Sequence, residues 1–185
     1  MTKRRKAAKI AGSAVKRLLI RPAPGNQRQA ILQVGSLTFR AALGRGGRTS
    51  RKREGDGATP IAVMPLLSAY RRGDRGPWPS TLLSMRRSSS DMLWCDAVGD
   101  PNYNRPVRAP FSPSHETLQR NDELYDVCIV LDWNLRSRKR RCGSAIFLHI
   151  ARPGYTPTEG CVAISPRDMR RLLPHLGPST TLQVL

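Results

Sequence analysis

The sequence is poor in acidic and aromatic residues. It has only 13 Asp and Glu against 32 Lys and Arg, which gives a formal net charge of +19 and a pI near 11.3. Such a surface attracts polyanions such as nucleic acid, anionic lipid or an acidic wall polymer, and charge alone does not choose among them. Aromatic residues make up 5% of the chain and are not interleaved with the basic ones, so no stacking platform for specific nucleic-acid binding is expected.

Cysteines are also few and widely spaced. Cys95, Cys128, Cys142 and Cys161 form no C-x-x-C pair, so the spacing of a zinc finger is absent and no metal site is expected. The sequence does not exclude a disulfide between Cys128 and Cys142. The glycine-rich stretch at 55–60 lacks the residue order of a phosphate-binding loop, so no nucleotide cofactor is expected either.

No apolar run approaches the roughly 20 residues that a membrane span needs. The basic start resembles that of a signal peptide, but Lys9, Lys16 and Arg17 interrupt the apolar stretch that export requires, so no clear signal is visible. We expect residues 1–27 to be a basic tail and linker, and residues 28–185 to form one folded domain.

The residue pattern predicts a mainly β domain with a few short helices. Prolines recur from Pro60 onward too densely for a helical domain. Strands are predicted at 125–134 and 143–150, and a hairpin at 30–34 and 37–43, whereas the Gly- and Arg-rich segment 44–60 is expected to be a flexible connection. One helix is predicted after Ser165, which can cap it, with Pro166 in its first turn.

The segment 149–165, HIARPGYTPTEGCVAIS, contains a histidine at a predicted strand end and a cysteine in a turn. A cysteine nucleophile needs a base or a helix N-terminus nearby, and His149 can supply the base for Cys161. Thr158, Glu159 and Gly160 form the turn, where backbone amides can converge on an oxyanion. The alternative is a buried thiol beside a structural histidine, and spacing alone does not decide between the two.

Three ordered segments resemble the YkuD-domain L,D-transpeptidases, in particular a proteobacterial branch of that family. SAIFLHI followed by PTEGCVAIS is similar to the family's histidine and [S/T]-x-G-C signature. GDGATPIAVMPL upstream is similar to its G-x-x-T-P stretch, and SHETLQRNDELYDVCIVLDWN resembles the segment leading into the catalytic half. The similarity covers about residues 30–185.

The resemblance implies a β-sandwich or barrel-like catalytic domain that acts on peptidoglycan stem peptides in the periplasm or cell envelope. Cys161 would be the nucleophile that forms a thioester, His149 the general base and acid, and the Gly160 and Cys161 amides the oxyanion site. No cofactor is implied. The acyl group would pass to an amine, giving a crosslink or exchange, or to water, giving L,D-carboxypeptidase action.

Three positions depart from the family pattern. Ile150 replaces a frequent glycine, Ala163 a frequent arginine, and Glu159 a frequent histidine. These departures leave the nucleophile and base intact but affect the expected choice of substrate.

Other polar residues are candidates for a substrate rim, and each has an ordinary structural alternative. They are His115, Tyr125, Thr158, Glu159, Tyr103 and Arg105. The basic tail can contact an anionic wall or lipid surface. The alternative function is a basic module that binds nucleic acid or cell wall without catalysis.

Overall fold

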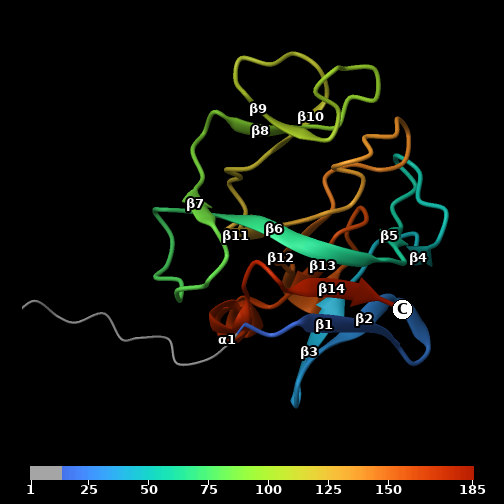
Figure 1. Ribbon diagram of the computed structural model, residues 1–185, viewed down its shortest axis with the longest axis vertical. Helices are drawn as coiled ribbons and strands as arrows, with labels where there is room; N and C mark the ends of the chain where they lie inside the picture. Colours follow the sequence, from blue (N-terminus) through green and yellow to red (C-terminus); the bar gives the residue numbers. More distant parts are fainter. Residues whose placement is uncertain (1–13) are drawn as a thin grey trace, which may run out of the picture.

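The computed structural model describes residues 14–185, which form short strands and little helix (Figure 1). The helical segments are α1 (Pro166–Leu172) and the 3-10 turns η1 (Pro153–Tyr155) and η2 (Leu173–His175). The strands are β1 (Arg17–Ala23), β2 (Asn26–Val34), β3 (Leu37–Ala42), β4 (Arg48–Thr49), β5 (Thr59–Pro60), β6 (Val63–Arg71), β7 (Met85–Arg87), β8 (Met92–Cys95), β9 (Arg105–Arg108), β10 (His115–Thr117), β11 (Val127–Leu131), β12 (Phe147–Ile150), β13 (Val162–Ile164) and β14 (Thr181–Val184).

The large sheet closes on itself. Its nine strands run in the order β11-β12-β13-β3-β2-β1-β14-β6-β7, and β6 also pairs with β11. This pairing joins every strand of the sheet except β7 into a ring. The strands β10, β8 and β9 form a separate three-stranded sheet, drawn at the top of Figure 1. The prediction of a mainly β, barrel-like domain with a few short helices is confirmed.

Alternating side chains fill the barrel. Leu18 and Ile20 of β1 are fully buried, while Arg17 and Arg21 of the same strand are exposed. Met169 and Leu172 of α1 join this core. The predicted cap of α1 is confirmed, because the Asp168 amide donates to Ser165 Oγ at 3.1 Å.

Strands β11 and β12 are buried on both faces, and this places the site. Leu148 and Ile150 belong to the barrel core. Phe147 and Cys128 instead join a second cluster with Trp94, which comes from β8 of the small sheet. His149 alternates with Leu148 and Ile150 along β12, so its side chain lies outside the barrel, toward the small sheet.

The expectation of a tail and linker was wrong for residues 17–27, and the expectation for residues 1–13 lies outside the described residues. Residues 17–23 are strand β1, which pairs antiparallel with β2 and parallel with β14. The exposed charges that suggested a tail alternate with core residues of a strand, and Gly25 (φ 71°) turns the chain into β2. The predicted hairpin is confirmed as β2 and β3.

The expectation of a flexible connection at 44–60 was also wrong. Short strands β4 and β5 pair with each other there, and Lys52 between them is only 7% exposed. The glycines of this segment allow close backbone approach. A Cβ at Gly44, for example, would lie 2.1 Å from the Gly57 carbonyl oxygen.

Candidate active site

A cavity of about 400 Å³ lies beside β12 and β13, next to the small sheet. His149 and Cys161 both line it, together with residues from β10, from the loop 152–159 and from the segment 54–55. Its charged lining residues are Glu54, Asp96, Glu116, Arg120, Arg152 and Glu159. Acidic side chains therefore gather here on a chain that is otherwise strongly basic.

Cys161 immediately precedes β13 and is 8% exposed. Its thiol donates to the Ala145 carbonyl oxygen at 3.2 Å, and its sulfur accepts the Phe147 amide at 3.3 Å. Burial raises the pKa of Cys161 to about 12, although the Phe147 amide and the Lys52 charge act in the opposite direction. The resting sulfur is thus a neutral thiol.

His149 is 4% exposed and its tautomer is fixed by the backbone. Its Nδ1 lies 2.9 Å from the Ile150 carbonyl oxygen, which can only accept, so Nδ1 carries the proton in the neutral ring. Nε2 is then the unprotonated nitrogen, as a general base requires. Burial lowers the pKa of His149 to about 4, so the imidazole is neutral at physiological pH.

The two side chains share one face of the sheet. Strands β12 and β13 are parallel, with His149 opposite Ala163. Cys161 stands two residues before Ala163, and side chains two apart along an extended chain point to the same face. The structure therefore brings the predicted nucleophile and base to one cavity.

The turn before the cysteine is held by the Thr158 hydroxyl. This hydroxyl donates to the Cys161 carbonyl oxygen at 2.7 Å and accepts the Gly160 amide at 3.2 Å. Gly160 has φ 131°, which an L-residue rarely adopts. Since the Gly160 amide already has an acceptor, the Cys161 amide is the better of the two candidate oxyanion donors.

Tyr125 packs against the histidine and is bonded in turn by Glu116. The Tyr125 ring packs edge-on against His149, with centroids 5.3 Å apart, and its hydroxyl donates to Glu116 Oε2 at 3.3 Å. Arg120 lies 3.7 Å from Glu116, and burial raises the pKa of Glu116. Tyr125 is thus both a packing residue and part of the cavity wall.

Glu54 is a cavity residue that sequence reasoning missed. Its Oε2 accepts the hydroxyl of Tyr103 and, at 3.0 Å, that of Ser144. Tyr103 is 2% exposed and does not line the cavity itself, and burial raises its pKa. Nothing in the local sequence distinguishes Glu54 from other acids of a loop, because its partners come from distant segments.

The three departures from the family pattern have different surroundings. Ile150 is buried in the barrel core, away from the cavity, whereas Ala163 lines the cavity with a small side chain. Glu159 is exposed at the cavity edge and forms an ion pair with Arg45 at 2.8 Å. Of the three, only Ala163 and Glu159 therefore border the cavity.

Two other predicted rim residues do not line the cavity. His115 is on β10, where its Nδ1 lies 2.7 Å from the Pro113 carbonyl oxygen. Arg105 is exposed on β9. Glu116, next to His115 in the sequence, points into the cavity instead, since neighbours in a strand face opposite sides.

All four cysteines are free, so no Cys128–Cys142 bridge is present. Among residues 14–185, no group of three or more His, Cys, Asp or Glu side chains is close enough to hold a metal ion. Within the same residues, no helix is both long and apolar enough to cross a membrane.

A known protein family matches most of the chain. The profile of the L,D-transpeptidase catalytic domain (YkuD) matches residues 23–184. A search of curated proteins found no relative.

Solved structures that resemble the chain include two L,D-transpeptidases from Mycobacterium tuberculosis. L,D-transpeptidase 1 has a TM-score of 0.41 and 13% identity, over 91% of this chain and 58% of that one. L,D-transpeptidase 3 has a TM-score of 0.44 and 12% identity, over 91% of this chain and 60% of that one. The chain thus spans less than two thirds of their length, and likenesses of this strength do not bear on activity.

Proposed function

Since the chain belongs to the L,D-transpeptidase (YkuD) catalytic-domain family, we propose that it transfers acyl groups of peptidoglycan stem peptides through a thioester on Cys161. The observation that carries the proposal is the placement of Cys161 and His149 on one face of adjacent strands, in one cavity. Family membership itself implies an acyltransferase acting on the cell wall, and hence in the cell envelope.

Acylation begins from two neutral groups. His149 Nε2 takes the thiol proton as the sulfur attacks the carbonyl carbon that follows an L-centre of the donor stem. The Cys161 amide stabilises the negative oxygen of the tetrahedral intermediate. The carbon–nitrogen bond then breaks, the D-residue leaves as an amine with the proton from His149, and a thioester remains.

Deacylation repeats these steps with a second nucleophile. An acceptor amine attacks the thioester carbon, gives a proton to His149 and forms a new amide as the Cys161 sulfur leaves and takes that proton back. Water in place of the amine releases a free carboxylate, which is the carboxypeptidase outcome. The acceptor thus decides between crosslink, exchange and hydrolysis, while the same two side chains move every proton.

The cavity charges suit a charged peptide. Arg120 and Arg152 line it and are among the charges that act on His149. Arg120 already donates to both Asp122 carboxylate oxygens at 2.8 Å, so we assign Arg152 to a carboxylate of a stem. Glu54, held by two hydroxyl groups, is suited to a substrate ammonium.

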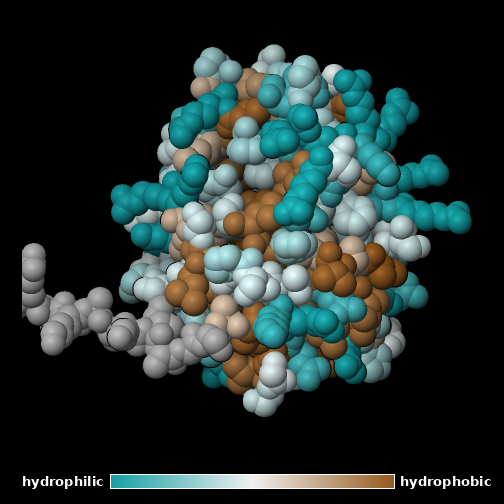
Figure 2. Space-filling view, viewed as in Figure 1, coloured by the Kyte–Doolittle hydropathy of each residue, from teal (hydrophilic) through white to brown (hydrophobic). Residues whose placement is uncertain are grey.

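Basic loops beside the cavity are suited to the anionic wall. The exposed side chains of Arg51 and Arg53 belong to one loop, and the exposed run 136–141 belongs to another. The Glu54 amide donates to the Arg141 carbonyl oxygen at 2.9 Å, so the two loops adjoin. Figure 2 shows long hydrophilic side chains projecting at the edge where Figure 1 places these loops.

Purified muropeptides test the proposal. The protein and its Cys161→Ala variant are incubated with tetrapeptide-bearing muropeptides, and products are identified by mass spectrometry. Cys142→Ala is the matched control, because Cys142 is a free cysteine outside the cavity. We expect crosslinked, exchanged or trimmed stems from the parent and the control and none from Cys161→Ala. Identical profiles from all three would leave only the binding-module interpretation.

A further inference from the structure

A buried lysine from the loop between β4 and β5 lies behind the nucleophile. The Lys52 side chain is 3% exposed, and its Nζ forms an ion pair with Asp56 and donates to the Arg53 carbonyl oxygen at 3.1 Å. Lysine is almost never this buried unless it is paired, and the pairing rarely repays the full cost of desolvation. A chain rich in exposed arginine and lysine has no need of such a group for solubility.

Lys52 lies close to two glycines that precede Cys161 in the chain. A Cβ at Gly143 (φ 90°) would lie 2.8 Å from Lys52 Cγ. A Cβ at Gly160 (φ 131°) would lie 3.4 Å from Lys52 Nζ and 2.9 Å from the Ala58 carbonyl oxygen. At Gly143 a Cβ would therefore clash with the lysine stem, whereas at Gly160 the Ala58 carbonyl oxygen excludes a Cβ and the ammonium lies at contact distance.

These two glycines lead directly into the reacting segment. Gly160 precedes Cys161, and Gly143 comes two residues before Ala145, whose carbonyl accepts the Cys161 thiol at 3.2 Å. One side chain thus touches the segment that carries the sulfur and the segment that orients it.

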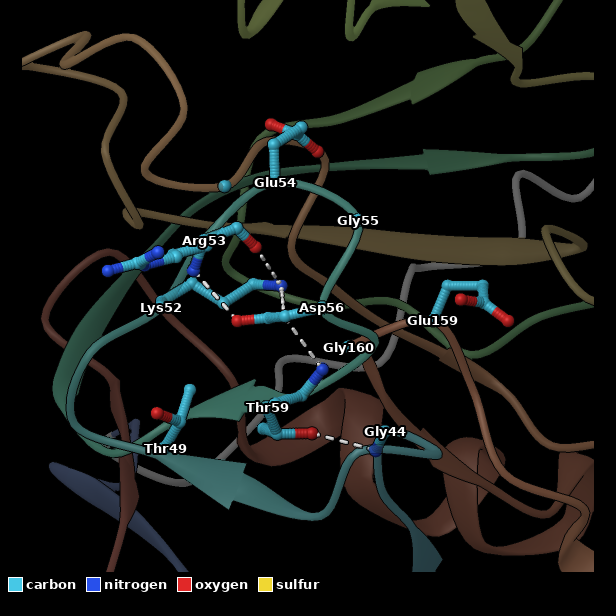
Figure 3. Close-up of polar contacts among 12 residues, drawn as sticks. Gly44, Thr49, Lys52, Arg53, Glu54, Gly55, Asp56, Thr59, Glu159 and Gly160 are labelled. Carbon is cyan, nitrogen blue, oxygen red and sulfur yellow. Dashed lines mark hydrogen bonds and ion pairs between the residues drawn. The ribbon is translucent and has the colours of Figure 1, made fainter.

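Asp56 ties the lysine to the rest of the loop. Its carboxylate accepts the Arg53 amide at 2.7 Å and the Ala58 amide at 2.9 Å, as Figure 3 shows beside Gly160. Next along the chain, Thr59 Oγ1 accepts the Gly44 amide at 2.9 Å. The ion pair is therefore part of a hydrogen-bonded loop that is held against the Gly160 turn.

The ammonium of the pair, and not the carboxylate, lies next to the Gly160 turn. Lys52 Nζ is among the three atoms nearest to the Cβ position of Gly160, and no Asp56 atom is. Burial raises the pKa of Cys161 to about 12, and the Lys52 charge opposes that rise. A fixed ammonium near the site stabilises negative charge that develops there, and the paired Asp56 carboxylate reduces the effect.

We propose that Lys52 is a positioning residue for Cys161: its ammonium, held by Asp56, fixes the Gly160 turn and favours negative charge on the sulfur and the oxyanion. Its importance for turnover rests on the proposed function, whereas its effect on the thiol does not.

Alkylation of Cys161 by iodoacetamide at neutral pH, followed by peptide mass spectrometry, measures the thiolate without any substrate. Lys52→Met keeps the buried stem and removes the charge, Lys52→Arg keeps the charge, and Arg17→Met removes an exposed charge from β1, away from the cavity. We expect about a tenfold slower reaction in Lys52→Met, recovery in Lys52→Arg and no change in Arg17→Met. With stem peptides, kcat falls in Lys52→Met while KM stays within about twofold.

A folded Lys52→Met protein that is alkylated at the parent rate would overturn the inference. If that variant does not fold, Lys52→Gln decides, because it keeps a polar group beside Asp56 and the Arg53 carbonyl oxygen but removes the charge, and alkylation at the parent rate would contradict the proposal. If the parent protein turns over no stem peptide but the variants show these alkylation changes, the proposed function is refuted and the role of Lys52 is not.

Discussion

Replacing Gly160 with alanine should damage both stability and chemistry. The residue has φ 131°, and the new Cβ would lie 2.9 Å from the Ala58 carbonyl oxygen, so the backbone has to move. Strain of this kind costs about 3 kcal/mol, which lowers the Tm of a domain of this size by roughly 6 to 12 °C. The movement displaces the adjacent Cys161 amide and sulfur, and loss of one oxyanion donor lowers kcat about a hundredfold.

Gly154→Ala is the matched control for this change. Gly154 also has a positive φ, 75°, and lies in the same loop, but its Cβ would have no neighbour within 4 Å. We expect it to cost about 1 kcal/mol and to leave kcat unchanged. Thermal denaturation and turnover of a donor stem are measured for both variants. Equal Tm and equal kcat in the two would refute the assignment of the Gly160 turn to catalysis.

Three further predictions concern the site and its edge. Burial sets the pKa of His149 to about 4 and that of Cys161 to about 12. The stopped-flow acylation rate should therefore be constant between these pH values and fall below pH 4, where His149 is protonated. A rate that changes near neutral pH would contradict a neutral pair. Because the His149 pKa is lowered from 6.5, the free energy of unfolding in urea should decline as pH falls from 6.5 to 4, by about 3 kcal/mol, and a flat profile would argue against a buried neutral ring. Glu159→His breaks an exposed ion pair with Arg45, so the unfolding free energy should change by less than about 0.5 kcal/mol while KM for the donor changes; a larger loss of stability would show that the pair is structural.

The local parts of the fold were predictable from the sequence. The hairpin of β2 and β3, the strand at β11 and the cap of α1 depend on residues near each other in the chain. That His149 and Cys161 act together could be predicted for the same reason, because both belong to one short segment and the family signature spans it.

The rest depends on contacts between distant segments. Strand β1 was hidden because its buried Leu18 and Ile20 alternate with arginines, and only pairing with β14 at the other end of the chain makes it a strand. Lys52 reads as one more charge in a basic loop until the fold places it against Gly160. Ile150 was expected to affect the substrate site, yet alternation along β12 directs it into the core.

In the proposed reaction, Cys161 carries the acyl group. Intact-protein mass spectrometry, after brief exposure to a donor tetrapeptide stem and acid quenching, measures this directly. We expect a mass increase equal to the mass of the donor less that of the free D-amino acid released, in the parent protein and in Cys142→Ala, and none in Cys161→Ala. An adduct that persists in Cys161→Ala, or a parent protein that turns over stems without one, would contradict it.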